Sequence, residues 1–241
     1  MTCRNLRGNQ RKKIYKNYTF DISGNELQIV VVPDKSVSYW PLSIGTESKF
    51  KDKLSSIDGD VGNAEWVNSD SYMNDNALEW NTDGGNPTST NQYGNYIRGH
   101  TDPFSIGITV EKFSETELDA ETIWSVGGSS SGSDTKLSCG FQDGNVGWGS
   151  RDDVINRSIS EPAPPYKSRF LCTWDGSIGK FYIDGSEITN DITGRISNTS
   201  VNGELTFGSQ PERERNLKTG RVINATFYKE AVTPSEDMIN L

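Results

Sequence analysis

The sequence predicts an all-β protein, folded as a sandwich of two antiparallel sheets. Short apolar runs recur along the chain, and Gly, Asp, Asn and Ser separate them, as in proteins built of short strands joined by polar loops. In residues 104–110 every second residue is apolar, which is the period of a strand with one buried face. The hydrophobic fraction is low, at 32%, but six Trp, nine Tyr and nine Phe supply large side chains for a core.

The chain before residue 104 carries fewer strand signals. Residues 37–44 are predicted to form a strand, and Pro41 within it requires a sheet edge or a bulge, because proline cannot donate a ladder hydrogen bond. Residues 45–76 are polar and are expected to form a long loop, with Trp66 and Tyr72 as its anchors. A loop of this length in a compact domain usually serves an interface or a function.

The chain after residue 110 continues as short strands joined by tight turns. Asp143-Gly144 is a strong signal for a two-residue hairpin turn, and Asp175-Gly176 and Asp184-Gly185 mark two further turns. Residues 233–236, Thr-Pro-Ser-Glu, form a capping box with proline at the first helical position, which predicts a single short C-terminal helix. The strands expected here are residues 122–126, 136–141, 145–148, 169–174, 180–183, 205–207 and 221–228.

The charge pattern divides the chain into a basic N-terminal arm, residues 1–27, and a sandwich domain, residues 28–241. The net charge is −9, yet the first 16 residues hold six basic residues and no acid, so the other 18 basic residues face all 33 acids. An acidic body argues against nucleic-acid binding, whereas the arm suits an acidic partner such as a neighbouring subunit. The basic residues of the arm are Arg4, Arg7, Arg11, Lys12, Lys13 and Lys16.

The sequence gives no sign of membrane insertion or of a disulfide framework. The longest apolar run, residues 29–32, is too short to span a bilayer, and the basic start is not followed by the apolar stretch of a signal peptide. Cys3, Cys139 and Cys172 are an odd number and too few for a framework. We expect Cys139 and Cys172 to be buried thiols of a protein folded in a reducing compartment, or of one whose leader was removed.

Several segments occur in a recognisable order: residues 37–42, 104–110, 170–185, 205–208 and 220–228, followed by the capping box. This order resembles the laminin-G-like branch of the concanavalin A-like lectin/glucanase superfamily over about residues 37–241. The Tyr182-Ile-Asp-Gly185 turn and the closing strand with its helix are the most specific parts. The resemblance implies a jelly roll. It does not imply one function, because the superfamily includes sugar-binding modules, glycan-cleaving enzymes, adhesion domains and parts of phage and viral particles.

The segment Glu117-Leu-Asp-Ala-Glu121 is similar to the Glu-x-Asp-x-Glu signature of β-glucanases in that superfamily. On a strand Glu117, Asp119 and Glu121 would share a face, but residues four apart are separated by more than the about 5–5.5 Å that a retaining glycosidase needs. Polar residues precede the segment and no Trp-rich strand does, so we interpret it as a loop. The one histidine, His100, has no nucleophile motif beside it and is interpreted as a loop residue. We therefore expect a non-enzymatic protein.

Two kinds of ligand site are considered. Five aspartates in predicted loops could supply oxygen ligands to calcium, but they form no spaced run, so no cofactor is expected and calcium is the alternative. A sugar site needs exposed aromatic rings beside hydrogen-bonding groups, and the alternative for its central tryptophan is packing inside the sandwich. The loop aspartates are Asp134, Asp143, Asp152, Asp153 and Asp175. The candidate sugar-binding residues are Trp148, Arg151, Asp152, Asp153 and Tyr166, with Tyr93 as a further aromatic.

Three classes of function remain open. The favoured one is a structural or decoration subunit of a phage or viral particle, held to neighbouring or identical subunits by the arm, with a lectin-like sandwich available to host glycans. The second is a free-standing or secreted carbohydrate-binding module. The third is a glycoside hydrolase or lyase that uses Glu117, Asp119 and Glu121.

Overall fold

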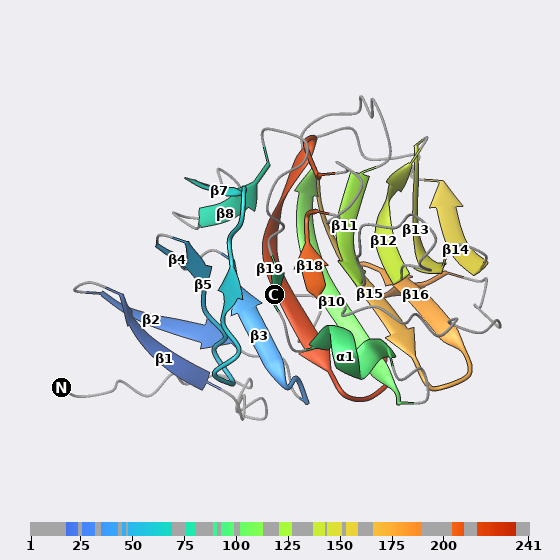
Figure 1. The fold of residues 1–241 in the computed structure, drawn as a ribbon, viewed down its shortest axis with the longest axis horizontal. Helices are drawn as coiled ribbons and strands as arrows, with labels where there is room; N and C mark the ends of the chain where they lie inside the picture. The colour runs from blue at the N-terminus through green and yellow to red at the C-terminus, as the bar shows by residue number, and fades with distance from the viewer. Residues whose placement is uncertain are drawn as a thin grey trace, which may run out of the picture.

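The computed structural model confirms an all-β sandwich of two antiparallel sheets (Figure 1). The strands of the two sheets lie in separate layers, and an additional two-stranded hairpin extends to one side. The structure describes residues 18–23, 26–31, 35–42, 45–46, 48–68, 76–80, 89–90, 93–98, 102–112, 121–126, 137–142, 144–150, 153–158, 166–188, 204–209 and 216–234.

The first sheet has the order β17-β16-β15-β10-β19-β8-β7. Its central strand, β10, pairs along its whole length with β15 on one side and with β19 on the other. β3 and β8 lie one after the other along the outer edge of β19. The strands are β3 (Ser38–Pro41), β7 (Glu65–Asn68), β8 (Asn76–Glu79), β10 (Phe104–Lys112), β15 (Tyr166–Trp174), β16 (Gly179–Ile183), β17 (Ser186–Glu187) and β19 (Gly220–Tyr228).

The second sheet has the order β14-β13-β12-β11-β18-β9-β6-β5-β4. As in the first sheet, segments far apart in the sequence become neighbours: β18 lies between β11 and β9. The strands are β4 (Gly45–Thr46), β5 (Lys49–Phe50), β6 (Gly59–Asp60), β9 (Ser89–Thr90), β11 (Glu121–Val126), β12 (Leu137–Gln142), β13 (Asn145–Ser150), β14 (Asp153–Ser158) and β18 (Leu205–Phe207).

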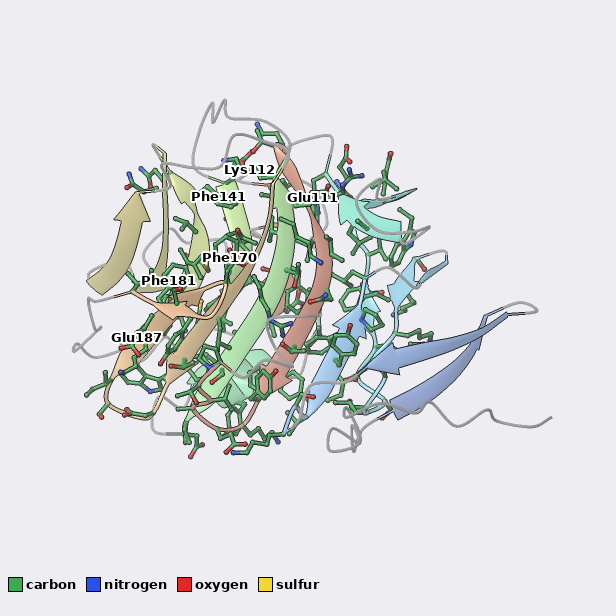
Figure 2. The ribbon with its side chains drawn as sticks, turned by 180° about the vertical axis from the view of Figure 1, so that it is seen from behind. Glu111, Lys112, Phe141, Phe170, Phe181 and Glu187 are labelled. Atoms are coloured by element: carbon green, nitrogen blue, oxygen red, sulfur yellow. The ribbon has the colours of Figure 1, made fainter. Side chains whose placement is uncertain are left out.

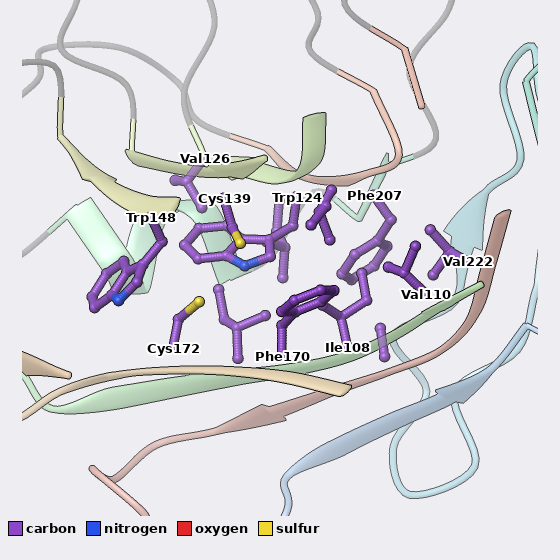
Figure 3. Close-up of a cluster of buried hydrophobic side chains, with 14 of the residues drawn as sticks. Ile108, Val110, Trp124, Val126, Cys139, Trp148, Phe170, Cys172, Phe207 and Val222 are labelled. Atoms are coloured by element: carbon purple, nitrogen blue, oxygen red, sulfur yellow. The ribbon is translucent and has the colours of Figure 1, made fainter. Parts of the chain in front are cut away.

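The core fills the space between the two sheets (Figure 3). The Phe170 ring packs at 5.9 Å from Phe141 of the opposite sheet and 6.1 Å from Phe181 of its own sheet. The predicted buried thiols are confirmed, since Cys139 and Cys172 are both free and buried, and they reach the core from opposite sheets. Cys3 lies outside the described residues.

β10 differs from the prediction of one buried face, because all nine of its residues are buried. Ile106 and Ile108 belong to the core, whereas Gly107 and Thr109 belong to the opposite face. The chain after β19 helps to cover that face: Val232 N donates to Ser105 Oγ (3.0 Å), which donates to the carbonyl of Glu230 (2.8 Å). A small second cluster packs there, formed by Leu171, Tyr182, Tyr228 and Val232.

The predicted turns and the predicted edge proline are confirmed. Asp184 and Gly185 have φ angles of 49° and 82° and join β16 to β17 as a two-residue turn with both φ angles positive. Gly144, with φ 71°, lies between the paired residues Gln142 and Asn145. Pro41 is the last residue of β3, an edge strand paired with β19.

The region between residues 45 and 100 departs from the prediction. The expected loop contains β4 to β7, and Trp66 is partly buried against the core as expected, whereas Tyr72 lies outside the described residues. The sequence predicts one helix, at the C-terminus, but the structure has α1 (Tyr93–Arg98), and residues 235–241 lie outside its description. Tertiary contacts explain α1, since the Tyr93 ring stacks on Phe227 at 4.1 Å. No helix among the described residues is long and apolar enough to cross a membrane.

The described part of the arm is a hairpin of β1 (Tyr18–Ser23) and β2 (Glu26–Val31). These two strands form a sheet of their own, and Figure 1 shows the hairpin extending away from the sandwich. The hairpin runs across residue 27, where the sequence places the end of the arm. Residues 1–17, which include the six basic residues of the arm, lie outside the described residues.

Candidate functional site

The predicted sugar-binding tryptophan lies in the core. Trp148 is 0% exposed, its ring packs 6.2 Å from that of Trp124, and its Nε1 donates to the carbonyl of Lys180 (3.1 Å). Trp148 therefore packs inside the sandwich, which was the alternative interpretation, and its indole offers no exposed ring to a sugar. The backbones of Asp153 and Tyr166 lie in β14 and β15, without described side chains, and Arg151 and Asp152 lie outside the described residues.

The third carboxylate of the glucanase-like segment has a structural partner. Glu121 is 4% exposed, and its Oε1 accepts hydrogen bonds from the backbone N of Lys218 (3.1 Å) and of Thr219 (2.9 Å). The Thr219 hydroxyl donates to the other carboxylate oxygen. These hydrogen bonds of Glu121 connect β11 to the turn before β19. Glu117 and Asp119, like His100, lie outside the described residues.

Among the proposed calcium ligands, Asp175 is the one whose side chain is described. Its Oδ1 accepts hydrogen bonds from Ile178 N (2.6 Å), Ser177 N (2.7 Å) and Ser177 Oγ (2.9 Å), and the Ile178 bond contributes most to lowering the pKa of Asp175. These contacts organise the turn between β15 and β16. No group of three or more potential metal ligands occurs in the described part of the chain. Asp134, Asp143 and Asp152 lie outside it, so calcium binding stays a prediction.

The candidate site lies instead on the face of the first sheet that points away from the second sheet, which we call the outer face. Arg169 in β15 pairs with Thr109 of β10, and both belong to the outer face because the next residue, Phe170, enters the core. The Arg169 guanidinium extends over Gly107, since a Cβ built there would lie 3.4 Å from Nη2. Arg169 is 6% exposed. It is a buried cation outside the apolar core.

Two tyrosines and a threonine surround this guanidinium. Burial lowers the pKa of Arg169, while the nearby phenols of Tyr228 and Tyr39 act to raise it. Burial also raises the pKa of Tyr228, and the positive charge of Arg169 opposes that shift. Thr226 Oγ1 donates to the Gly107 carbonyl (3.2 Å). We call Arg169, Gly107, Thr226, Tyr39 and Tyr228 the arginine cluster.

Two members of the arginine cluster, Arg169 and Tyr228, have polar side-chain atoms without a hydrogen-bond partner in the described part of the chain. Nε, Nη1 and Nη2 of Arg169 have no hydrogen-bond partner among the described residues, and neither does the hydroxyl of Tyr228. Arg169 and Tyr228 affect each other's pKa, but their atoms do not form a hydrogen bond of normal geometry. Buried polar groups are nearly always paired, so these atoms are exceptions, as are the indole nitrogens of Trp80 and Trp124 in the core.

The carboxylates nearest this face are engaged elsewhere. Glu111 Oε2 accepts from Arg221 Nε (2.8 Å), and Glu187 Oε1 accepts from Lys180 Nζ (2.8 Å). Asp184 accepts from the backbone N of Arg169 (2.7 Å) and from a serine hydroxyl, so it holds the strand rather than the guanidinium. Figure 2 shows Glu111 and Glu187 toward opposite ends of the sheet. None of these three carboxylates is therefore a partner of the guanidinium, whose nitrogens are closed off from solvent.

Sequence reasoning missed Arg169 as a site residue. Its position in the alternating run Arg169-Phe-Leu-Cys-Thr-Trp174 gives the face of the strand on which it lies. The alternation does not reveal that the outer face is itself covered. From the sequence, Arg169 is expected to be an ordinary solvent-exposed arginine, which gives no indication of a site.

No protein-family model matches the chain, and no curated protein matches it. Several solved structures are similar in fold. A Trypanosoma rangeli sialidase in complex with sialic acid aligns with a TM-score of 0.64 and 16% identity over 91% of this chain and 34% of the sialidase chain. The same sialidase in complex with 2,3-difluoro-KDN aligns with a TM-score of 0.65 and 16% identity, over 93% of this chain and 36% of the sialidase chain. The binding domain of Paraclostridial Mosquitocidal Protein 1 aligns with a TM-score of 0.57 and 13% identity, over 86% of this chain and 52% of that domain's chain.

These similarities show the fold alone, because the identities are low. The chain spans about a third of the length of the sialidase that it matches. The neighbours agree with the predicted β-sandwich fold and give no support to a particle origin.

Proposed function

We propose that this chain is a carbohydrate-binding module whose task is recognition rather than cleavage. The observation that carries the proposal is the match of most of this chain to about a third of a sialidase chain that was described with sialic acid, together with a match to a binding domain. A sandwich of this size would suffice as one recognition unit within a glycan-directed protein. Fold similarity is an analogy, so the function has to be tested directly.

The engagement of the described carboxylates supports recognition over cleavage. Most glycosidases place two carboxyl groups on either side of the scissile bond. Glu121, Glu111 and Asp175 instead accept hydrogen bonds from the protein itself. Each of them therefore has a structural task.

A glycan array probed with the full chain, with and without calcium, tests this function. We expect saturable binding to a restricted set of glycans, and a blank array under both conditions would contradict it. The matched assay is turnover of sialyllactose and of a β-glucan. We expect no released sugar. Release of sugar by the parent chain that is abolished in Glu117→Gln, with the fold intact by circular dichroism, would instead assign the chain to the hydrolases.

A second candidate is a subunit of an assembly, anchored by residues 1–31, and the hairpin favours it. The register pairs Tyr18 with Val31, Phe20 with Ile29 and Ile22 with Leu27, so these six apolar positions share one face. An isolated two-stranded hairpin is marginally stable in water and gains stability when such a face packs against a partner. Six basic residues before it suit the acidic surface of another copy.

Light scattering on the full chain and on a chain lacking residues 1–31 tests this candidate. We expect the full chain to associate and the shortened chain to be a monomer that keeps glycan binding. If the full chain is monomeric at every concentration, in low salt and without detergent, the result would contradict self-association through the arm. The particle role stays a prediction of the sequence.

A further inference from the structure

We propose that Cys139 and Cys172 are a disulfide site, which links the two sheets through the core when the chain folds under oxidising conditions. The inference concerns the stability of the sandwich and does not depend on carbohydrate binding. It derives from two free thiols that point toward each other from opposite sheets (Figure 3). The structure describes this pair in its reduced form.

The first step concerns the placement of the pair. Cys139 lies in β12 of the second sheet and Cys172 in β15 of the first sheet, and both belong to the main core cluster with 0% exposure. Figure 3 shows the two sulfur atoms directed toward each other across the space between the sheets. The thiols also affect each other, since burial and then the neighbouring Cys139 raise the pKa of Cys172. Two cysteines of separate sheets are therefore neighbours in the core.

The second step concerns the surroundings of the pair. In the second sheet, Cys139 is paired with Trp124 of β11 on one side and with Trp148 of β13 on the other. The two indoles pack 6.2 Å apart and are both buried, so close packing fixes the position of Cys139. In antibody domains a disulfide joins two packed sheets beside a buried tryptophan, which shows that the distance between the sheets of a sandwich can be bridged.

The third step concerns the covalent chemistry. Two S–H bonds break and one S–S bond forms, while two protons and two electrons pass to a small disulfide such as oxidised glutathione, which becomes two thiols. This exchange needs a thiolate that the small disulfide can reach. The folded chain restricts both requirements, because the two thiols are buried and burial raises the pKa of Cys172. The bridge therefore forms during folding, before the sheets close over the thiols.

The fourth step concerns the effect of the bridge. The bridge closes a loop of about thirty residues, which lowers the entropy of the unfolded chain and so stabilises the folded one. It connects β12 to β15, two strands of different sheets that no ladder of hydrogen bonds joins. Once the core has formed, burial keeps reductants away from the sulfurs. Such a bridge suits a protein that folds in a secretory compartment or works outside the cell.

Refolding of the full chain in glutathione buffers tests the proposal. The chain carries Cys3→Ser, so that Cys139 and Cys172 are the cysteines that remain. The reduced chain is diluted from urea into mixtures of oxidised and reduced glutathione, and free thiols are trapped with iodoacetamide after denaturation. We expect a mass about 2 Da below that of the reduced chain, no trapped thiol and a linked pair of peptides. The equilibrium constant for bridge formation should be at least about tenfold larger in the folded chain than in urea, because fold and bridge stabilise each other equally.

The matched control is Cys139→Ala in the same Cys3→Ser chain, which keeps Cys172 but cannot form the bridge. We expect dithiothreitol to lower the urea midpoint of the bridged chain by at least about 0.5 M and to leave that of the control unchanged. Two trapped thiols after refolding in the oxidised buffer would overturn the proposal, and so would glutathione attached to each cysteine without a linked peptide. Equal equilibrium constants in the folded chain and in urea would also overturn it. Mass analysis of the Cys3→Ser chain requires no substitution in the core.

Discussion

In the central strands β10 and β15 of the first sheet, the residues of the inner face and those of the outer face are buried to a similar extent, yet against different chemistry. Toward the second sheet, Phe170 and Cys172 meet other apolar side chains, and burial stabilises the fold in proportion to the area removed from water. On the outer face, Arg169 and Tyr228 are as deeply buried but have orphaned polar atoms. The comparison teaches that the two faces of one strand can be equally buried although one is apolar and the other holds a charged side chain without a hydrogen-bond partner among the described residues.

The largest expected effect breaks the inner face. Phe170→Ala should lower the free energy of unfolding by about 3–5 kcal/mol, because it removes a ring that touches both sheets and leaves a cavity. Urea denaturation measures the change. The matched variant is Leu171→Ala on the outer face, which packs in a much smaller cluster and should cost less. A larger loss for Leu171→Ala than for Phe170→Ala would contradict the assignment of the main core.

A smaller effect tests the close packing of the outer face. Gly107→Ala should destabilise the protein by about 1–3 kcal/mol, since its Cβ would meet Thr226 Oγ1 at 2.5 Å. It should also displace the guanidinium, because that Cβ would lie 3.4 Å from Arg169 Nη2. The double variant Gly107→Ala/Thr226→Ala should recover part of the stability, which a double-mutant cycle measures. Simple additivity of the two losses would show that the steric account is wrong.

A substitution on the outer face is expected to raise the free energy of unfolding, whereas substitutions on the inner face lower it. Arg169→Met should raise the free energy of unfolding by about 1 kcal/mol in the absence of ligand, because it removes an uncompensated buried charge and keeps the volume. Lys167→Met, with the same charge change at a less buried site, should alter stability by less than about 0.5 kcal/mol. A marked loss of stability in Arg169→Met would mean that the guanidinium has a stabilising partner within the fold.

The smallest effect at neutral pH concerns the thiols of the inner face. Burial, together with the neighbouring Cys139, raises the pKa of Cys172 well above its ordinary value. A raised pKa means that the folded state holds the proton more tightly, so this contribution is complete below the thiol's ordinary pKa and is lost as pH rises above it. We expect iodoacetamide at pH 8 to label both cysteines of the reduced protein only after denaturation. Rapid labelling of Cys139 or Cys172 in the folded protein, located by peptide mass spectrometry so that Cys3 is counted separately, would contradict their burial.

The strands illustrate how far local pattern reaches. The alternation in residues 104–110 predicted β10, and Asp184-Gly185 predicted a turn whose two φ angles are positive. α1 was not predicted, because Gly94 and Asn95 have weak helix propensity and the helix depends on Tyr93 packing against Phe227. The sugar-binding role of Trp148 was inferred from its polar neighbours in the sequence, but its indole lies against Trp124 inside the sandwich.

The sequence by itself determined the all-β class, most strand positions, the tight turns and the burial of Cys139 and Cys172, because alternation and turn residues act over a few neighbouring positions. Tertiary structure alone decided that β10 lies between β15 and β19, that Glu121 is held by Thr219, and that Arg169 is buried without a counter-charge. Each of these depends on which distant segments meet. Burial and charge compensation result from contacts between segments that are distant in the sequence, so no local sequence pattern predicts them.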